Sequence, residues 1–195
     1  MVHASAASAK TMLRASLRDL RKTLAAGTPD AAERAAGLFP ADRLTKVSVA
    51  AGYRARGGEI DPWPLMQRLA SYGVRLALPV ASDRDSPLIF RAFHDGDQLT
   101  PDAFGIASPL PEADEVTPDL VITPLLAFDR FGGRIGQGGG HYDRTLALLR
   151  ARSPVLVLGL AYAGQQVAGL PLEPHDQRLD AILTEKAYIE AEKDL

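Results

Sequence analysis

Cysteine is absent from this chain of 195 residues. The absence excludes disulfide bridges, thiolate nucleophiles and zinc sites with sulfur ligands, and it is typical of a protein from a reducing compartment. A charge excess is also missing, because the formal net charge is only −2. We therefore expect neither a basic face for nucleic acid nor a polybasic surface for membranes.

Long apolar runs are equally scarce. The first nine residues, MVHASAASA, contain no apolar core of the length that a signal peptide needs, and no later stretch is long enough to span a membrane. An apolar content of 46% and a charged content of 24% are typical of a soluble globular protein. We expect a cytoplasmic monomer with a flexible N-terminus, residues 1–9, and a single domain, residues 10–195.

Glycine, by contrast, is concentrated in one stretch, FDRFGGRIGQGGGHYDRTL at 128–146, where six of the nine residues from 132 to 140 are glycine. We call residues 132–140 the glycine loop. Glycine weakens helices and strands, but it lets the backbone adopt positive φ and approach a ligand closely. Such a turn can direct several N–H groups toward one anion, and a helix beginning at His141 would add its partial positive charge.

Charged side chains flank the glycine loop. Arg134 and Arg144 supply guanidinium groups suited to phosphate. Asp143 is the only carboxylate between Asp129 and the end of the following helix, which makes it the natural metal ligand beside a phosphate. The loop matches neither GxxxxGK[ST] nor the context of a dinucleotide-binding GxGxxG. On glycine content alone, a flexible surface loop is the alternative.

Residues 10–26 predict an amphipathic helix with two stripes. The apolar stripe comprises Leu13, Leu17, Leu20 and Leu24, and the cationic stripe comprises Lys10, Arg14, Arg18 and Arg21. A stripe of like charges is usually a solvated face. Here Asp19 is the only acidic residue between positions 10 and 29, so an anionic ligand opposite the stripe is the other interpretation.

Strand and helix signals alternate along the rest of the chain. Strands are expected at 47–52, 74–80, 88–93, 119–124, 155–161 and 181–184, and helices at 31–39, 61–72 and 141–150, the first two capped by Asp30 and Asp61. Residues 99–118, with four prolines, predict an irregular crossover, and a polar tail follows 184. The alternation predicts a three-layer α/β/α domain with a mainly parallel sheet. Ligands of such sheets bind beyond the carboxyl ends of the strands, where the glycine loop follows 119–124.

Three segments carry a resemblance to one enzyme family. PLLAFDRFGGRIGQGGGHYDRTL, 124–146, is similar to the signature of 5-formyltetrahydrofolate cyclo-ligases, also called methenyltetrahydrofolate synthetases, with its G-x-R-[LI]-G-x-G-x-G-[YFH]-Y-D-R pattern. GGEIDPWPL, 57–65, and LPLEPHDQRLDAILTE, 170–185, resemble two flanking motifs. The resemblance covers about residues 10–186. The sequence departs from the family at 105–109, where Ser108 replaces an acid.

The resemblance implies a fold like the ribose-phosphate isomerase and CoA-transferase arrangement. It also implies an activity, the ATP- and Mg²⁺-dependent cyclisation of 5-formyltetrahydrofolate to 5,10-methenyltetrahydrofolate with release of ADP and phosphate. The formyl oxygen would first be phosphorylated, so no protein nucleophile is required. Alternatives are a sugar-phosphate isomerase or acyl-CoA enzyme on a related fold, and a non-catalytic folate- or nucleotide-binding module.

The family's site residues are carried over where this sequence matches. ATP-binding residues are predicted to be Lys10, Arg14, Arg134, Ile135, Gly136, Gln137, Gly138, Gly139, Gly140, His141 and Tyr142. Folate-binding residues are predicted to be Arg54, Glu59, Gln137, Gly138, Gly139, Gly140 and His141. The predicted magnesium ligands are Asp143 and Asp176.

Several assignments keep an alternative. A carboxylate at Glu59 can accept two parallel N–H bonds from a pterin edge, but an exposed loop acid is the other interpretation. Arg54 could be a solvated arginine. His175 is expected to have a structural role rather than that of a base. Phe104 is expected to pack in the core, and the alternative is that it lines a pterin pocket. The phosphate role extends to neither Arg18 nor Arg21.

Overall fold

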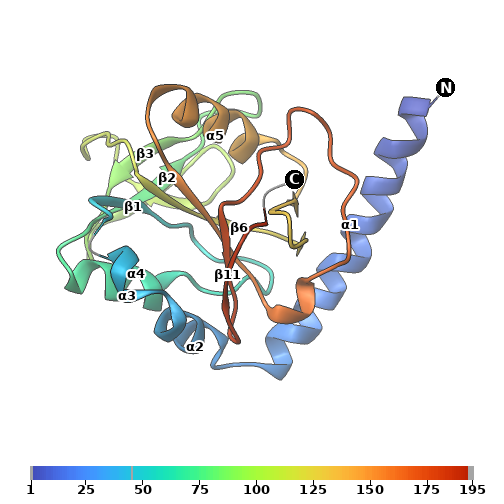
Figure 1. The fold of residues 1–195 in the computed structure, drawn as a ribbon. Helices are drawn as coiled ribbons and strands as arrows, with labels where there is room; N and C mark the ends of the chain where they lie inside the picture. The colour runs from blue at the N-terminus through green and yellow to red at the C-terminus, as the bar shows by residue number, and fades with distance from the viewer. Residues whose placement is uncertain (1, 45, 193–195) are drawn as a thin grey trace.

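The computed structural model describes the backbone of residues 2–44 and 46–192 and the side chains of residues 11–43 and 46–192. A seven-stranded sheet runs through its centre in the order β11-β10-β9-β6-β1-β2-β3 (Figure 1). The strands are β1 Val49–Ala51, β2 Arg75–Val80, β3 Ile89–Ala92, β6 Leu120–Pro124, β9 Leu156–Leu160, β10 Ala181–Leu183 and β11 Tyr188–Glu190. The five strands from β10 to β2 pair in parallel, and only the outermost strands β3 and β11 pair antiparallel. The predicted mainly parallel sheet is confirmed.

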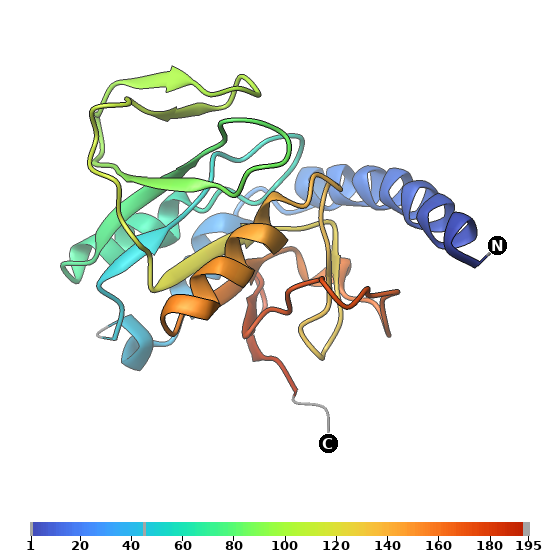
Figure 2. The ribbon, with the colours of Figure 1, turned by 90° about the horizontal axis from the view of Figure 1, so that it is seen from above.

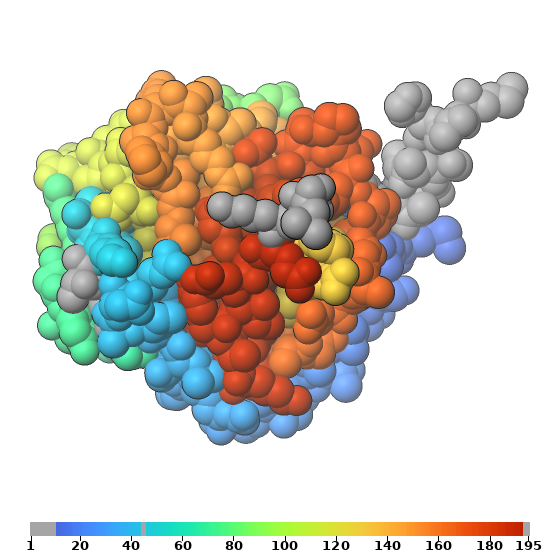
Figure 3. Space-filling model, viewed as in Figure 1, coloured from blue at the N-terminus to red at the C-terminus, as the bar shows by residue number. Residues whose placement is uncertain are grey.

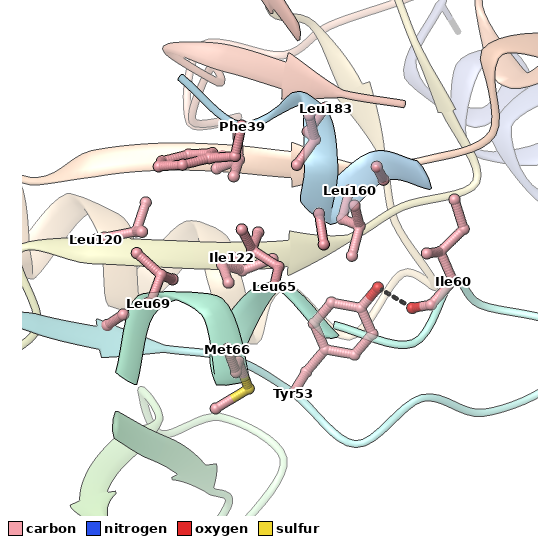
Figure 4. Close-up of a cluster of buried hydrophobic side chains, with 14 of the residues drawn as sticks. Phe39, Tyr53, Ile60, Leu65, Met66, Leu69, Leu120, Ile122, Leu160 and Leu183 are labelled. Carbon is pink, nitrogen blue, oxygen red and sulfur yellow. Dashed lines mark hydrogen bonds between the residues drawn. The ribbon is translucent and has the colours of Figure 1, made fainter. Parts of the chain in front are cut away.

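The parallel strands are mainly apolar because both faces of the sheet are covered, and Arg75 and Thr123 are the polar exceptions. Within β2, Leu76 and Leu78 face one core and Ala77 faces the other. Helices α2 Ala31–Leu38 and α4 Trp63–Ser71 cover the first face, and α5 His141–Arg152 covers the second (Figure 1). Figure 4 shows the first core, in which side chains of α4 pack on β6. The three-layer α/β/α prediction is confirmed.

Helix α1, Val2–Gly27, lies outside these layers (Figures 1 and 2). Leu13 and Leu17 of its apolar stripe pack against Leu126 and Ile135, and its end contacts the short helix η1 Ala163–Gln165. Leu20, which was expected in that stripe, is 39% exposed. The helix starts eight residues earlier than expected, and the flexibility of residues 1–9 stays a prediction.

Two expectations about the remaining chain are wrong. Residues 99–118 contain a hairpin, β4 Leu99–Pro101 and β5 Ala107–Pro109, set apart from the main sheet (Figure 2). The Asp102 carboxylate closes this hairpin by accepting the N–H groups of Phe104 and Ile106 at 2.8 and 2.9 Å. The C-terminal residues expected as a polar tail include β11, a partly exposed edge strand of three residues in which Tyr188 and Ile189 pack against the two cores.

The C-terminal strand lies beside the short helix α3 Ala41–Leu44 at the surface (Figure 3). Arg43 pairs there with Glu190 at 2.6 Å. The expected capping by Asp30 is wrong, because its side chain makes no capping bond and instead lies 3.8 Å from Arg34. The Asp61 carboxylate does accept the Trp63 N–H of α4, at 3.0 Å. Among the helices of the described chain, none is long and apolar enough to cross a membrane.

The glycine loop is divided between two uses. Gly132, with φ +77°, and Gly133 form the turn between β7 Ala127–Phe128 and β8 Arg134–Ile135, a small hairpin missed by the sequence prediction. A Cβ at Gly132 would collide with the Leu179 carbonyl oxygen, and a Cβ at Gly133 would collide with the Asp129 carboxylate. Gly132 and Gly133 therefore serve packing, and neither is among the residues of this loop that were predicted to bind a ligand, which begin at Arg134.

Candidate active site

A cavity of about 800 Å³ opens beyond the carboxyl ends of β1, β2 and β6. Its other walls are α1, the hairpin loop at 102–106, the start of α5 and the turn at 173–176. Every predicted site residue whose side chain the structure describes lines this cavity. The side chain of Lys10 lies outside the described residues.

Helix α1 holds the glycine loop through two arginines. Arg14 Nε donates to the Gly136 carbonyl oxygen at 3.2 Å, and Arg18 Nε donates to Gln137 Oε1 at 2.9 Å. Gly138 has φ +99°, and a Cβ there would lie 3.2 Å from the Arg14 guanidinium. Arg14 and Arg18 of the cationic stripe therefore both face the glycine loop, and Arg18 belongs to the same contact as Arg14.

The start of α5 forms the next wall. Gly140 precedes the helix with φ +68°, a conformation that glycine adopts without steric cost. Arg144 on the first turn donates to the Gly139 carbonyl oxygen at 3.0 Å and to the Arg84 carbonyl oxygen at 2.7 Å. The side chain of Arg144 thus joins the glycine loop to the turn that follows β2.

An aromatic pair lines the cavity beside this helix start. His141 meets Phe104 edge-on, with ring centroids 5.2 Å apart, and its Nε2 lies 3.0 Å from the Asp83 carbonyl oxygen. Phe104 is 43% exposed, so its expected packing in the core is wrong. Ser108, at the family's acid position, is buried and donates to the Pro79 carbonyl oxygen at 3.1 Å, which gives it a structural role.

Arg134 and Asp143 form a nearly buried ion pair. Arg134 Nη2 lies 2.7 Å from Asp143 Oδ1, and the side chains are 5% and 22% exposed. The Gln177 N–H donates to the same carboxylate oxygen at 2.9 Å. Burial lowers the pKa of Arg134, while the Asp143 charge raises it. Arg134 Nε is buried and has no hydrogen-bond partner in the described chain.

Two further carboxylates, those of Glu173 and Asp176, lie in the turn at 173–176. Glu173, His175 and Asp176 each offer a possible ligand atom within 4.8 Å of the others, and Asp143 is not part of that group. Asp176 Oδ2 accepts the Glu173 N–H at 2.7 Å. The Gln177 amide, next to Asp176 in the chain, bonds to Asp143. Oxygen donors of this kind suit Mg²⁺, and Glu173 was not predicted among them.

Another part of the cavity wall is built around Glu59. Its side chain is 9% exposed, so the interpretation as an exposed loop acid is wrong. Arg21 Nη1 lies 3.1 Å from Glu59 Oε1, and the Arg56 N–H donates to Oε2 at 3.0 Å. Tyr53 of the same wall donates its hydroxyl to the Ile60 carbonyl oxygen at 2.6 Å (Figure 4). Arg54 lines the cavity but is exposed.

Two tyrosines beside Glu59 give a prediction about alkaline pH. Burial, followed by the Glu59 charge, raises the pKa of Tyr53 and of Tyr142 above the usual value of about 10. The unfolded chain therefore releases these protons first. The stability that they contribute is present below pH of about 10 and is lost as pH rises further. In an absorbance titration, both hydroxyls should ionise only with unfolding, whereas titration of all five tyrosines in the folded protein near pH 10 would contradict this.

Sequence reasoning missed Arg18 and Arg21 as part of the site. Arg21 lies one turn from Leu17 and Leu24 on α1, at the border of the apolar stripe. That position could have indicated a contact with the rest of the protein, because a cation at the border of the apolar stripe lies next to the surface on which the helix packs. Its partner Glu59, 38 residues away, could not be read from spacing alone.

A mainly parallel sheet, an arginine row, a glycine-lined wall and a group of carboxylates define an α/β protein with a cationic cavity for an anionic ligand. A sequence profile of the 5-formyltetrahydrofolate cyclo-ligase family matches residues 6–185. The chain belongs to the 5-formyltetrahydrofolate cyclo-ligase family and is an enzyme of the ligase class.

Individual relatives support this membership. The 5-formyltetrahydrofolate cyclo-ligase of Escherichia coli K12 is 38% identical over 132 residues, which cover 65% of this chain and 72% of the relative. That of Mycolicibacterium smegmatis is 30% identical over 191 residues, covering 93% and 96%. The NMR structure of Aquifex aeolicus 5,10-methenyltetrahydrofolate synthetase has a TM-score of 0.74 and 27% identity, covering 95% of this chain and 94% of that one.

Proposed function

We propose that the cavity catalyses the ATP-dependent cyclisation of 5-formyltetrahydrofolate to 5,10-methenyltetrahydrofolate, with release of ADP and phosphate. The observation that carries this proposal is that one cavity is lined by two chemically distinct groups of residues, which we call the cationic end and the folate end. Arg14, Arg134 and the glycine loop form a cationic end suited to a triphosphate. Glu59 provides a nearly buried carboxylate at the other end, suited to the N–H groups of a pterin.

The chemistry requires positioning and charge neutralisation more than a protein nucleophile. The formyl oxygen attacks the γ-phosphorus of ATP as the bond to the bridging oxygen breaks, and ADP leaves. The second folate nitrogen then attacks the activated carbon, loses its proton, and phosphate leaves as the ring closes. Arg134, with its buried Nε, and the N–H groups that begin α5 are available to bind the transferring phosphoryl group.

The carboxylates at the cationic end fit a magnesium ion. Asp143 and Asp176 would hold Mg²⁺, with Glu173 beside Asp176, because the Gln177 N–H joins Asp143 to the turn that carries the other two carboxylates. When bound, Mg²⁺ supplies neutralisation of phosphate charge. The Gln177 N–H keeps the Asp143 carboxylate oriented between Arg134 and the turn at 173–176.

The folate end combines one fixed acceptor with an aromatic surface. Glu59 accepts N–H groups of the pterin, and His141 with Phe104 offers ring edges and apolar contact near the glycine loop. Arg54, exposed at the rim, is suited to an anionic part of the substrate.

An assay of methenyl-product absorbance tests the proposal. Product should form from 5-formyltetrahydrofolate only when ATP and Mg²⁺ are both present. Turnover without ATP would favour a sugar-phosphate isomerase or acyl-CoA enzyme, and binding without turnover would favour a non-catalytic folate- or nucleotide-binding module.

We also propose a cytoplasmic monomer without nucleic-acid or membrane partners. Sedimentation analysis of the purified protein tests whether it is a monomer.

Replacing Arg14 by alanine is expected to raise KM for ATP about 10- to 100-fold, because a charge-assisted hydrogen bond contributes about 1.5–3 kcal/mol. The KM for folate should change little, since Arg14 lies at the glycine loop. We expect the same of Lys10. Arg152→Ala, at the exposed end of α5, is the matched control and should leave both constants unchanged. Equal increases in both KM values would contradict a phosphate role for Arg14.

A further inference from the structure

Arg21 is a deeply buried cation on α1, with 3% of its surface exposed. Its Nη1 donates to Glu59 Oε1 at 3.1 Å and to the Leu125 carbonyl oxygen at 3.2 Å. Its Nη2 donates to the Gly57 carbonyl oxygen at 3.2 Å. These partners come from two separate parts of the cavity wall, the loop after β1 and the chain after β6. One guanidinium therefore ties the N-terminal helix to both.

The Glu59 carboxylate is fixed at both of its oxygens. Oε1 is bound by Arg21 and Oε2 by the Arg56 N–H. A carboxylate oxygen accepts two hydrogen bonds, so each keeps room for one more donor. A carboxylate this buried is stable in its charged form only when a counter-charge compensates for lost water. Arg21 is the cation that pairs with Glu59 in the described chain.

We propose that Arg21 is a positioning residue for folate recognition, holding Glu59 charged and oriented to accept two N–H groups of a 2-amino-4-oxopyrimidine edge. This inference rests on the proposed function. Arg21 acts through Glu59, while Arg14 and Arg18 of the same helix contact the glycine loop. The cationic stripe of α1 is thereby divided, with its last arginine serving the folate end of the cavity.

The geometry favours arginine over lysine at this position. A planar guanidinium reaches three acceptors in different directions, whereas an ammonium is a compact charge on a flexible stem. A lysine at position 21 would keep the charge beside Glu59 but would not reproduce all three bonds. Arg21→Lys should therefore restore part of what Arg21→Ala loses.

The test measures folate binding and turnover separately in Arg21→Ala, Arg21→Lys, Glu59→Gln and the double variant Arg21→Ala/Glu59→Gln. Calorimetry with 5-formyltetrahydrofolate in the absence of ATP should give about 10- to 100-fold weaker binding for Arg21→Ala and a smaller loss for Arg21→Lys. The KM for ATP should change little. The double variant should bind no more weakly than Glu59→Gln alone, because both changes remove the same interaction.

Arg34→Ala is the matched control, since Arg34 forms an exposed pair with Asp30 on α2, and it should leave binding unchanged. Equal increases of KM for both substrates, or additive losses in the double variant, would overturn the positioning role. Circular dichroism checks that each variant folds. If Arg21→Ala does not fold, the other two single variants decide. Full folate affinity in Arg21→Lys together with unchanged affinity in Glu59→Gln would then overturn the positioning role of Arg21. A wild-type protein that binds folate but forms no product would refute the proposed function and leave the inference about Arg21 standing.

Discussion

Asp143→Asn is expected to lower kcat at least about 100-fold, the largest effect on activity that we predict. The substitution removes a negative charge between Arg134 and the group that contains Asp176. Asparagine can still accept the Arg134 and Gln177 N–H bonds through its side-chain oxygen, so the fold should persist. Turnover measured across a magnesium titration tests this prediction.

The control for that variant is Asp97→Asn, a partly exposed acid in the turn after β3 that binds the His94 N–H. It should leave both activity and magnesium dependence unchanged. Full activity of Asp143→Asn at saturating magnesium would count against the metal role. A large fall in melting temperature with normal turnover would instead assign Asp143 to stabilising buried Arg134.

Gly132→Ala should cause the largest loss of stability, about 2–4 kcal/mol in the free energy of unfolding. The added Cβ must tolerate φ +77° and also collides with the Leu179 carbonyl oxygen, a backbone atom that cannot move away cheaply. At this chain length, a loss of 3 kcal/mol lowers the melting temperature by about 6–12 °C. Urea unfolding gives the free energy directly.

Gly96→Ala separates the two causes of that loss. Gly96 has a similar φ, +87°, but no atom lies within 4 Å of a Cβ built there. Its replacement should cost only about 1 kcal/mol, the penalty for the left-handed conformation itself. Equal losses in the two variants would mean that the contact with Leu179 does not matter.

The central strands could be predicted from sequence because burial on both faces leaves a continuous apolar run. β2, β6 and β9 all fall within the expected ranges. The elements at the edges of the fold could not be predicted in the same way. β11 is an edge strand of only three residues and is partly exposed, and the β4–β5 hairpin is closed by an Asp102 side chain whose bonds no periodicity reports.

The candidate site was predictable where one contiguous motif carries it. Arg134 and Asp143 are nine residues apart in that motif, and they form the ion pair of the cationic end. The motif could not reveal that Gly132 serves packing, since that depends on Leu179 from a distant segment. Nor could it reveal the Arg21–Glu59 pair, which depends on how α1 packs against the sheet.

The position of α1 outside the layers has a consequence for synthesis. Arg14 is translated 122 residues before Gly136, the partner that it binds in the cavity. A helix in a protein draws most of its stability from packing of its apolar face, and the residues on which α1 packs, Leu126 and Ile135, are also translated much later. Arg14 therefore cannot make its contact in the cavity until the chain through Gly136 has been synthesised, so this part of the site is completed late in translation.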